Sequence, residues 1–329
     1  MSLPALSQFN LPIPVEVKKI LDSVASDERL SRYLPGGLLL SGLGLAYVAN
    51  QYLSSRALNY GTKAKFDWDK EIILITGGSN GIGAATVQKL LKRGNQIVVV
   101  DVLPLTYKQD GGRKDSSVTI PDPNSPPGLT LFLSEVGDPT VIIANAGICR
   151  GRPILAAQKK DIELTFGVNT LGLIWTIKAF LPSLVARNHG HVLIVASQTG
   201  HTTTAGVTDY SASKAAAIAI YEGIHTEMKH VYKAPAVRVS CISPSHVQTA
   251  MFTGVHSVPG MSSLTPTFLA EKICGILYSG RAQNVMVPRS AYATTLMRVL
   301  PDWVRVYLQD LAAGAFTDLK PHDPLSKSA

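Results

Sequence analysis

A tyrosine and a lysine four residues apart, Tyr210 and Lys214, are the first pair whose types and spacing could do chemistry. On a helix this spacing puts both side chains on one face. An ammonium beside a phenol stabilises the phenolate and lowers the pKa of the tyrosine toward neutrality, so the phenol could exchange a proton with a carbonyl or alcohol oxygen. Ser197 stands thirteen residues before the tyrosine, at the end of an apolar run, where its hydroxyl could hydrogen-bond the same oxygen.

A glycine-rich stretch, Thr76–Gly83, follows the short apolar run Ile72–Ile75 and precedes a helical pattern at Ala84–Leu91. Glycines between a strand and a helix let the backbone turn tightly and approach a pyrophosphate, which then lies at the helix N-terminus. Ordinary loops also contain such glycines, but this placement between strand and helix favours a dinucleotide-binding turn.

Asp101 closes the next apolar run, 18 residues after Gly83. A carboxylate at that place accepts hydrogen bonds from both ribose hydroxyls and repels a 2′-phosphate. No lysine or arginine lies within Gly77–Gly83. Asp101 by itself could be a solvated residue at a strand end, but together with the glycines it predicts NAD, rather than NADP, as the cofactor.

These side chains need a framework of strands alternating with helices, and the chain provides one. Such alternation predicts a parallel sheet with right-handed crossovers, covered on both faces. We therefore predict an α/β fold, a doubly wound parallel sheet of the Rossmann type, in a single catalytic domain at residues 71–290. The stretch Gln109–Pro127 interrupts the alternation, because its Gly, Ser, Asp and Pro residues are typical of a loop. The expected strands are 72–75, 97–100, 141–144, 192–196 and 237–242, and the expected helices are 84–91, 161–184, 212–230 and 266–278.

Two apolar segments flank this domain. In the N-terminal region, residues 1–70, the window Tyr33–Ser55 has no charged residue and is about as long as a bilayer-spanning helix. It is either a membrane anchor or a buried helix of the soluble domain, and we expect the anchor.

In the C-terminal region, residues 291–329, apolar side chains at helical spacing predict an amphipathic helix and tail that either packs on the domain or contacts a membrane. Those side chains are Leu300, Trp303, Val304, Tyr307, Leu308 and Leu311.

Composition narrows the class of protein. The 329 residues include 31 Lys and Arg against 23 Asp and Glu, a net charge of +8, with 46% hydrophobic and 16% charged residues. These fractions exclude a disordered chain, and the chain is too polar for a polytopic membrane protein. The basic residues form no run of five, so we expect no nucleic-acid partner and prefer attraction to an anionic membrane surface. Three scattered cysteines predict neither a disulfide framework nor a metal site, and they indicate a reducing compartment.

From about Glu71 to Thr249 the chain resembles the short-chain dehydrogenases/reductases. The motifs that carry this resemblance are Thr76–Gly83 for TGxxxGxG, Asn145–Gly147 for NAG, the helix asparagine Asn169, the set Ser197, Tyr210 and Lys214, and Pro244–Thr249 for Pro-Gly-x-Val-x-Thr.

The resemblance implies a role for each matching residue. Tyr210 would be the general acid/base, Lys214 its electrostatic partner and a ribose ligand, Ser197 the group that holds the substrate oxygen, and Asn169 the residue that orders a proton relay. The implied cofactor-binding residues are Thr76, Gly77, Ser79, Asn80, Gly81, Ile82, Gly83, Asp101, Asn145, Ala146, Gly147, Tyr210, Lys214, Pro244, Val247 and Thr249.

Within the family, the finer resemblance is to the membrane-associated branch of retinol dehydrogenases and 17β-hydroxysteroid dehydrogenases. Its signs include the apolar N-terminal segment, Gly137–Thr140 before the NAG strand, Lys178–Pro182 and Asn188–His191. Two departures stand out. Ser245 replaces the usual glycine after Pro244. The interval between Asp101 and Val141 is shorter than is usual in the family, and Asp122 is the residue in it nearest to the place of the family's adenine-contacting aspartate.

This resemblance implies an NAD(P)(H)-dependent oxidoreductase that interconverts a lipophilic alcohol and its carbonyl compound, of the retinoid, steroid or long-chain lipid class. One alternative is a ketoreductase of a biosynthetic pathway. A non-enzyme alternative is an inactive, membrane-anchored cofactor-binding protein. We expect a homodimer at the endoplasmic reticulum or a lipid droplet, with the catalytic domain cytosolic. The family's mobile substrate lid would begin at Met251 and Phe252.

Overall fold

A computed structural model describes residues 34–107, 137–256 and 263–320, together with Val15, Glu16, Lys19 and Ser23. The chain divides into two compact units, Met1–Ser54 and Ser55–Ala329. The expected loop Gln109–Pro127, with the adenine candidate Asp122, lies outside the described residues.

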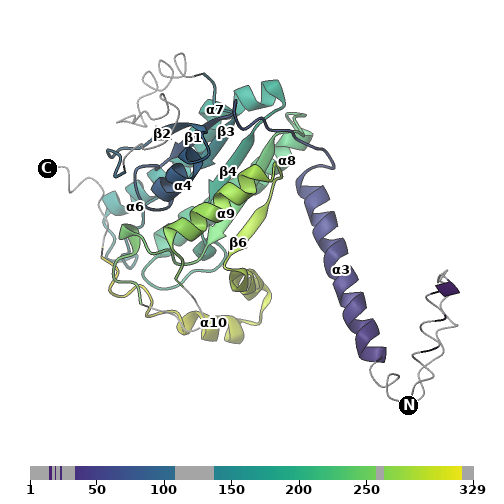
Figure 1. The fold of residues 1–329 in the computed structure, drawn as a ribbon. Coiled ribbons are helices and arrows are strands. Elements are labelled where there is room, and N and C mark those ends of the chain that lie inside the picture. The colour runs from purple at the N-terminus through teal and green to yellow at the C-terminus, as the bar shows by residue number, and fades with distance from the viewer. Residues whose placement is uncertain are drawn as a thin grey trace. The chain divides into compact units, whose positions relative to one another are not determined.

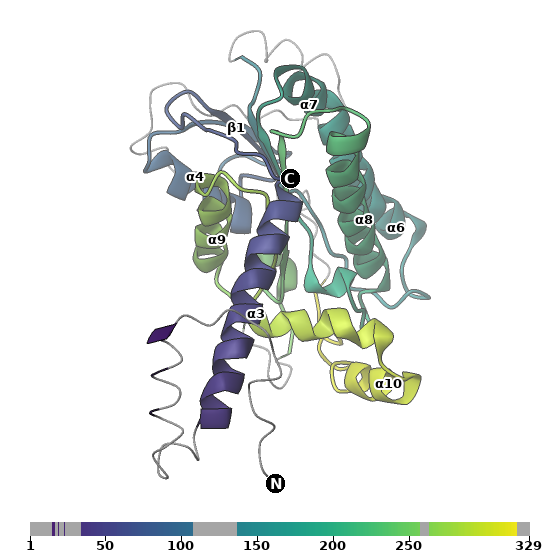
Figure 2. The ribbon, with the colours of Figure 1, turned by 90° about the vertical axis from the view of Figure 1, so that its right-hand side faces the viewer.

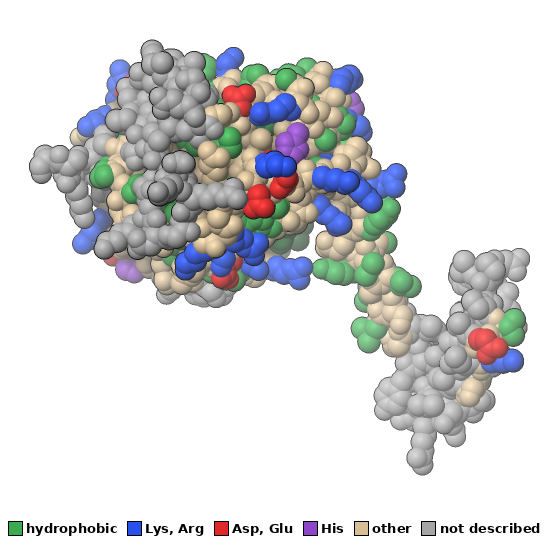
Figure 3. Space-filling view, turned by 45° about the horizontal axis from the view of Figure 1, so that its top comes forward, with side chains coloured by type: hydrophobic (Ala, Val, Ile, Leu, Met, Phe, Trp, Pro, Cys, Tyr) green, Lys and Arg blue, Asp and Glu red, His purple; other side chains and the backbone are tan. Residues whose placement is uncertain are grey.

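The first unit contains most of helix α3 (Leu34–Leu58), which covers the uncharged window of the sequence. Its large apolar side chains are exposed, with Leu40 at 71% and Leu45 at 72%. Figure 3 shows hydrophobic side chains on several sides of this helix. Among the described residues, however, the stretch long and apolar enough to cross a membrane is Lys159–Arg187, in the second unit, and not α3.

A six-stranded parallel sheet forms the centre of the second unit, in the order β2-β1-β3-β4-β5-β6. The chain moves outward from β1 to β2 and then returns to the other side of β1, so the order reverses between β1 and β3. In open α/β sheets ligands bind at the carboxyl ends of the strands beside such a switch point. The strands are β1 (Ile72–Thr76), β2 (Gln96–Val100), β3 (Val141–Ala144), β4 (His191–Val195), β5 (Arg238–Pro244) and β6 (Asn284–Val287).

Helices cover both faces of the sheet, as Figures 1 and 2 show. Alternate residues of a strand point to opposite faces, so Ile73 and Ile75 of β1 join one core while Leu74 joins the other. Helices α4 (Gly81–Leu91) and α9 (Pro266–Tyr278) cover the first face. Helices α6 (Lys159–Phe166), α7 (Leu173–Arg187) and α8 (Thr208–His230) cover the second.

The predicted α/β fold is confirmed, with differences that matter for the site. The helix expected at 161–184 is interrupted by a π-helical segment, η2 (Gly167–Gly172), between α6 and α7. Helix α8 begins four residues earlier than expected, so Tyr210 lies in its first turn. Strand β6 was not predicted, because its four residues begin with a polar one and give a weak pattern.

The C-terminal region forms a 3₁₀ segment, η5 (Arg289–Val299), and the short helix α10 (Asp302–Asp310). No residue of α10 is buried, and Trp303 and Tyr307 are 77% and 62% exposed. After α10 the chain contains two buried residues, Ala315 and Leu319, and Leu319 packs in a cluster with Cys149 and Val207.

Candidate active site

The carboxyl ends of five adjacent strands, β2, β1, β3, β4 and β5, bring predicted site residues together. The register pairs Thr76 of β1 with Ala144 of β3, and Val195 of β4 with Ile242 of β5. The residues that follow these ends line one cavity of about 1470 Å³. All the predicted catalytic residues, and all the predicted cofactor-binding residues except Ser79 and Gly83, line it.

The glycine-rich turn is built so that side chains would not fit. A Cβ atom on Gly83 would lie 2.0 Å from the carbonyl oxygen of Gly77, and Gly77 itself has a φ of +67°. The Asn145 amide Nδ2 donates to the carbonyl oxygens of Thr76 at 3.0 Å and Gly77 at 2.9 Å. The Thr76 hydroxyl accepts from the backbone N–H groups of Asn145 and Ala146. The NAG turn therefore holds the glycine turn in shape, and bare backbone faces the cavity where a dinucleotide pyrophosphate would lie.

Asp101 follows β2 and lines the cavity. Its Oδ2 accepts from the backbone N–H of Ser79 at 2.8 Å, and its Oδ1 accepts from that of Leu103 at 3.0 Å. These bonds fix the carboxylate at the wall and leave further lone pairs on each oxygen. The Asp101 carboxylate is therefore held in place beside the glycine turn, where it can accept further hydrogen bonds. It is not a freely solvated residue at a strand end.

Tyr210 and Lys214 are buried, with exposures of 5% each. Burial raises the pKa of the Tyr210 phenol, and a hydrogen bond with Ser197 opposes this only in part. Burial also lowers the pKa of Lys214 to about 8. The spacing predicts a tyrosine pKa shifted toward neutrality, but in this structure desolvation acts in the opposite direction and holds the phenol neutral.

The position of Lys214 explains why its charge acts weakly on the tyrosine here. Its Nζ donates to the carbonyl oxygen of Val195 at 2.9 Å and lies 5.9 Å from the centroid of the Tyr210 ring. A Cβ atom on Gly147 would lie 3.3 Å from the same Nζ, so the glycine leaves the lysine room that a larger residue would narrow.

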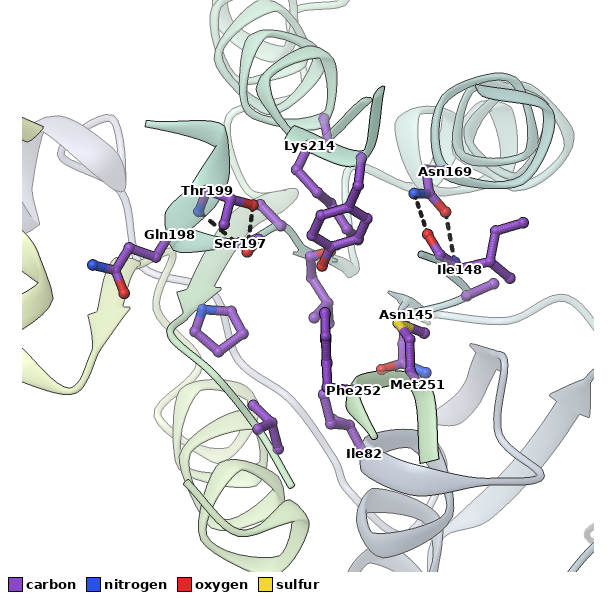
Figure 4. Close-up of a pocket in the computed structure, with 18 of the residues that line it drawn as sticks. Ile82, Asn145, Ile148, Asn169, Ser197, Gln198, Thr199, Lys214, Met251 and Phe252 are labelled. Carbon is purple, nitrogen blue, oxygen red and sulfur yellow. Dashed lines mark hydrogen bonds between the residues drawn. The ribbon is translucent and has the colours of Figure 1, made fainter. Parts of the chain in front are cut away.

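Ser197 caps a 3₁₀ turn, η3 (Gln198–Gly200), directly after β4. Its Oγ accepts from the backbone N–H of Thr199 at 3.2 Å and from the Thr199 hydroxyl at 3.0 Å (Figure 4). Because both contacts use the oxygen as acceptor, the Ser197 hydroxyl can donate its proton either to the Tyr210 oxygen or to a ligand oxygen beside it.

Asn169 lies in the π-helical segment and is 2% exposed. Its Nδ2 donates to the carbonyl oxygen of Ile148 and to Ser213 Oγ, both at 2.9 Å, and its Oδ1 accepts from the backbone N–H of Ile148 at 2.8 Å. Figure 4 shows the paired contact with Ile148. The side chain therefore joins the loop after β3 to helix α8. π-Helical turns of this kind occur often at functional sites.

Long-range packing brings to the site a C-terminal segment that the sequence did not indicate. The Phe252 ring meets the Tyr210 ring edge-on at 5.8 Å and the Phe316 ring at 6.3 Å. Backbone hydrogen bonds join His256 to Ala315 and Lys320 to Thr253. We call residues 315–320 the C-terminal strap. It lies about sixty residues beyond the loop that it contacts, so no local pattern could have revealed it.

Ser245, the departure from the family pattern, is accommodated in the loop Pro244–Thr249. Its backbone N–H donates to the carbonyl oxygen of Val287 at 2.7 Å, which ties the loop to β6. Its side chain lines the cavity. Further along the same loop, Gln248 and Leu264 are joined by a backbone hydrogen bond of 2.8 Å.

A family model described as short chain dehydrogenase matches residues 130–258. Estradiol 17-beta-dehydrogenase 11 of Homo sapiens is 30% identical over 245 residues, covering 70% of this chain and 80% of that protein. Human 17-beta-hydroxysteroid dehydrogenase 13 is 34% identical over 248 residues, covering 73% and 77%. Retinol dehydrogenase 10-B of Danio rerio is 38% identical over 173 residues, covering 51% of each chain.

Among solved structures, a short chain dehydrogenase from Burkholderia cenocepacia in complex with NADP superposes with a TM-score of 0.62 at 23% identity, covering 74% of this chain and 99% of that one. The chain therefore belongs to the short-chain dehydrogenase/reductase family. It is an NAD(P)-dependent oxidoreductase that acts on CH–OH groups.

Proposed function

We propose that this protein interconverts a lipophilic alcohol and its carbonyl compound. The observation that carries the proposal is the wall of the cavity next to Tyr210, which is largely apolar. Large apolar ligands gain free energy when such a surface leaves water. Relatives named for estradiol, hydroxysteroids and retinol support the same substrate class. The lining residues concerned are Met251, Phe252, Val255, Ala291, Met297, Ala315 and Phe316.

The chemistry follows from where each side chain lies. A bound nicotinamide supplies or accepts the hydride. Tyr210, held neutral by burial, gives its proton to the substrate oxygen during reduction and takes it back during oxidation. Ser197 donates a hydrogen bond to the same oxygen, and Lys214 contacts the ribose and supports the phenolate when it forms. Asn169 keeps the loop after β3 and helix α8 in register, and we assign it the ordering of a proton relay.

We propose NAD as the preferred cofactor. The Asp101 carboxylate is fixed by two backbone N–H groups beside the glycine turn, where it would repel a 2′-phosphate. The glycine turn from Gly77 to Gly83 contains no basic residue that would bind such a phosphate.

We also propose that the protein is a homodimer attached to the endoplasmic reticulum or a lipid droplet, with its catalytic domain in the cytosol. Exposed leucines of α3 and exposed Trp303 and Tyr307 of α10 supply apolar surface for lipid contact. Deleting residues 1–54 should release the protein from membranes while cofactor binding is kept, because the second unit, which holds the sheet and the buried Asn59, begins at Ser55. Full-length protein that is soluble without detergent would contradict the attachment.

The activity is tested with a panel of steroid, retinoid and long-chain alcohols, assayed with NAD and with NADP by absorbance at the reduced nicotinamide band. Ketone analogues assayed with the reduced cofactors test the ketoreductase alternative. Turnover of an apolar alcohol that Tyr210→Phe abolishes is the expected result. Binding of NADH, measured by fluorescence, without turnover of any panel member would favour an inactive cofactor-binding protein.

A further inference from the structure

Thr199 lies in the wall of the cavity, two residues after Ser197, in the 3₁₀ turn η3. Its side-chain oxygen is 3.0 Å from Ser197 Oγ, and its backbone N–H donates to the same oxygen at 3.2 Å (Figure 4). In a helical turn, a threonine hydroxyl commonly bonds to a backbone carbonyl oxygen three or four residues earlier. The Thr199 hydroxyl instead bonds to the side chain that is proposed to hold the substrate oxygen.

The direction of the bond between the two hydroxyls follows from the single proton of Ser197. A hydrogen bond from Ser197 stabilises the Tyr210 phenolate and opposes the rise that burial causes in the pKa of the phenol. Because this bond uses the Ser197 proton, the bond with Thr199 must use the Thr199 proton, and Ser197 Oγ accepts it.

These two contacts limit what the Ser197 hydroxyl can do. A hydroxyl group has one proton to donate and two lone pairs that accept hydrogen bonds. The backbone N–H of Thr199 occupies one lone pair of Ser197, and the Thr199 hydroxyl occupies the other. Ser197 can therefore give a hydrogen bond to the Tyr210 oxygen or to a ligand oxygen, but it cannot accept one from either.

This limit sets the orientation of a bound alcohol. In the proposed reaction the alcohol oxygen lies between Ser197 and Tyr210, and its hydroxyl proton needs an acceptor. Because both lone pairs of Ser197 are occupied, the acceptor of the two is the Tyr210 oxygen, which is the proton transfer that oxidation requires. Without the Thr199 hydroxyl, one lone pair of Ser197 would be open. The alcohol could then donate to Ser197, in a pose that does not deliver its proton to Tyr210.

We propose that Thr199 is a positioning residue, whose hydroxyl makes Ser197 a hydrogen-bond donor only and so directs the substrate proton to Tyr210. A bond given to Ser197 Oγ also polarises the Ser197 O–H group and strengthens the bond that this group donates. The inference rests on the proposed oxidoreductase function, and it extends that function to a residue that acts through Ser197.

Two substitutions separate the hydroxyl of Thr199 from its shape. Thr199→Val keeps the branched shape without the hydroxyl, and Thr199→Ser keeps the hydroxyl without the methyl group. With the best alcohol of the panel, Thr199→Val should lower kcat/KM about fivefold, as expected for one hydrogen bond, whereas Thr199→Ser should stay within about twofold of the wild type. Thr226→Val is the matched control. It makes the same change at an exposed position of α8, where the hydroxyl bonds to carbonyl oxygens of its own helix, and it should leave kcat/KM unchanged.

A double-mutant cycle tests whether Thr199 acts through Ser197. Residues that act as a unit have effects that do not add. In protein that already carries Ser197→Ala, Thr199→Val should change kcat/KM by less than about twofold, because the oxygen that the hydroxyl positions is gone. A residue that only supports the turn would lower kcat/KM by the same factor in both backgrounds. Where Ser197→Ala is too slow to assay, the comparison of Thr199→Val with Thr199→Ser decides.

The proposal is overturned by a Thr199→Val kcat/KM equal to or above that of the wild type, since a gain means that Ser197 donates to Thr199. Equal losses in Thr199→Val and Thr199→Ser, or an undiminished loss in the Ser197→Ala background, would assign Thr199 a packing role and overturn it as well. A wild type that binds NADH but turns over no member of the panel contradicts the proposed function itself, which is a separate result. NADH binding also shows whether each variant is folded. If Thr199→Val is not, Thr199→Ala takes its place, with the same loss expected.

Discussion

Replacing Gly254 with alanine should detach the C-terminal strap from the active-site loop. Gly254 has a φ of +91°, and a Cβ atom on it would lie 2.1 Å from the carbonyl oxygen of Asp318. A left-handed backbone costs a non-glycine residue about 1–2 kcal/mol, and overlap with a backbone oxygen cannot be relieved by a rotamer change. Either the loop or the strap must therefore move.

The contacts set the size of the effect. Two backbone hydrogen bonds hold the strap, between His256 and Ala315 and between Lys320 and Thr253, and Leu319 is 5% exposed. At about 1 kcal/mol for each hydrogen bond and about 2 kcal/mol for the leucine, full detachment lowers the free energy of unfolding by about 4 kcal/mol. Detachment also removes Phe316 from the Phe252 ring that packs on Tyr210.

Thermal unfolding, limited proteolysis of the C-terminus and steady-state kinetics test this reasoning. Gly254→Ala should unfold at a lower temperature, lose its C-terminus to protease, and show a raised KM for the best alcohol of the panel with unchanged NADH affinity. Gly314→Ala is the matched control, since a Cβ there meets nothing within 4 Å. Wild-type proteolysis and KM in Gly254→Ala would refute the strap as a wall of the site.

Three further changes test the site itself. Tyr210→Phe should lower kcat at least a hundredfold and keep NADH affinity within a few-fold of the wild type, whereas Lys214→Ala should reduce both kcat and NADH affinity. A kcat of Tyr210→Phe near that of the wild type would exclude Tyr210 as the general acid/base. Asp101→Ser should bring kcat/KM with NADP closer to that with NAD, and equal wild-type efficiency with both cofactors would contradict the proposed preference. The pKa of Lys214 is lowered to about 8 when folded, so between pH 8 and 10 this residue binds more protons in the unfolded chain and contributes a rise of stability with pH, whereas the buried cysteines, whose pKa values burial raises, contribute a fall. In urea titrations over this range the stability of Lys214→Met should therefore decrease more steeply with pH than that of the wild type, and equal slopes would contradict the lowered pKa.

The sequence predicted those parts of the site that depend on local patterns. Buried strands are recognised in the sequence as apolar runs. Residues at the carboxyl ends of these strands meet because the ends of parallel strands lie at the same edge of the sheet. Thr76, Asn145, Ser197 and Pro244 line one cavity for this reason. The Tyr210–Lys214 spacing likewise depends only on helix geometry.

Other features depend on contacts between distant segments. The π-helical turn at Asn169 has no clear sequence signal, because a single extra residue in a helical turn leaves the apolar pattern almost unchanged. The direction of the tyrosine pKa shift depended on burial, which spacing does not report.

The two halves of the cavity differ in how firmly they are held, and this difference bears on how an apolar substrate reaches Tyr210. The cofactor half is fixed by parallel strands and by the Asn145 bonds to the glycine turn. The other half is closed by chain segments joined through few contacts, among them Gln309 Nε2 to the carbonyl oxygen of Thr203 and Thr204 Oγ1 to that of Ala312, both at 3.0 Å. Segments held by few, partly exposed hydrogen bonds open at lower free energy than a sheet. The η5–α10 wall is therefore the part of the cavity best suited to open, and it carries the exposed apolar side chains proposed to contact lipid.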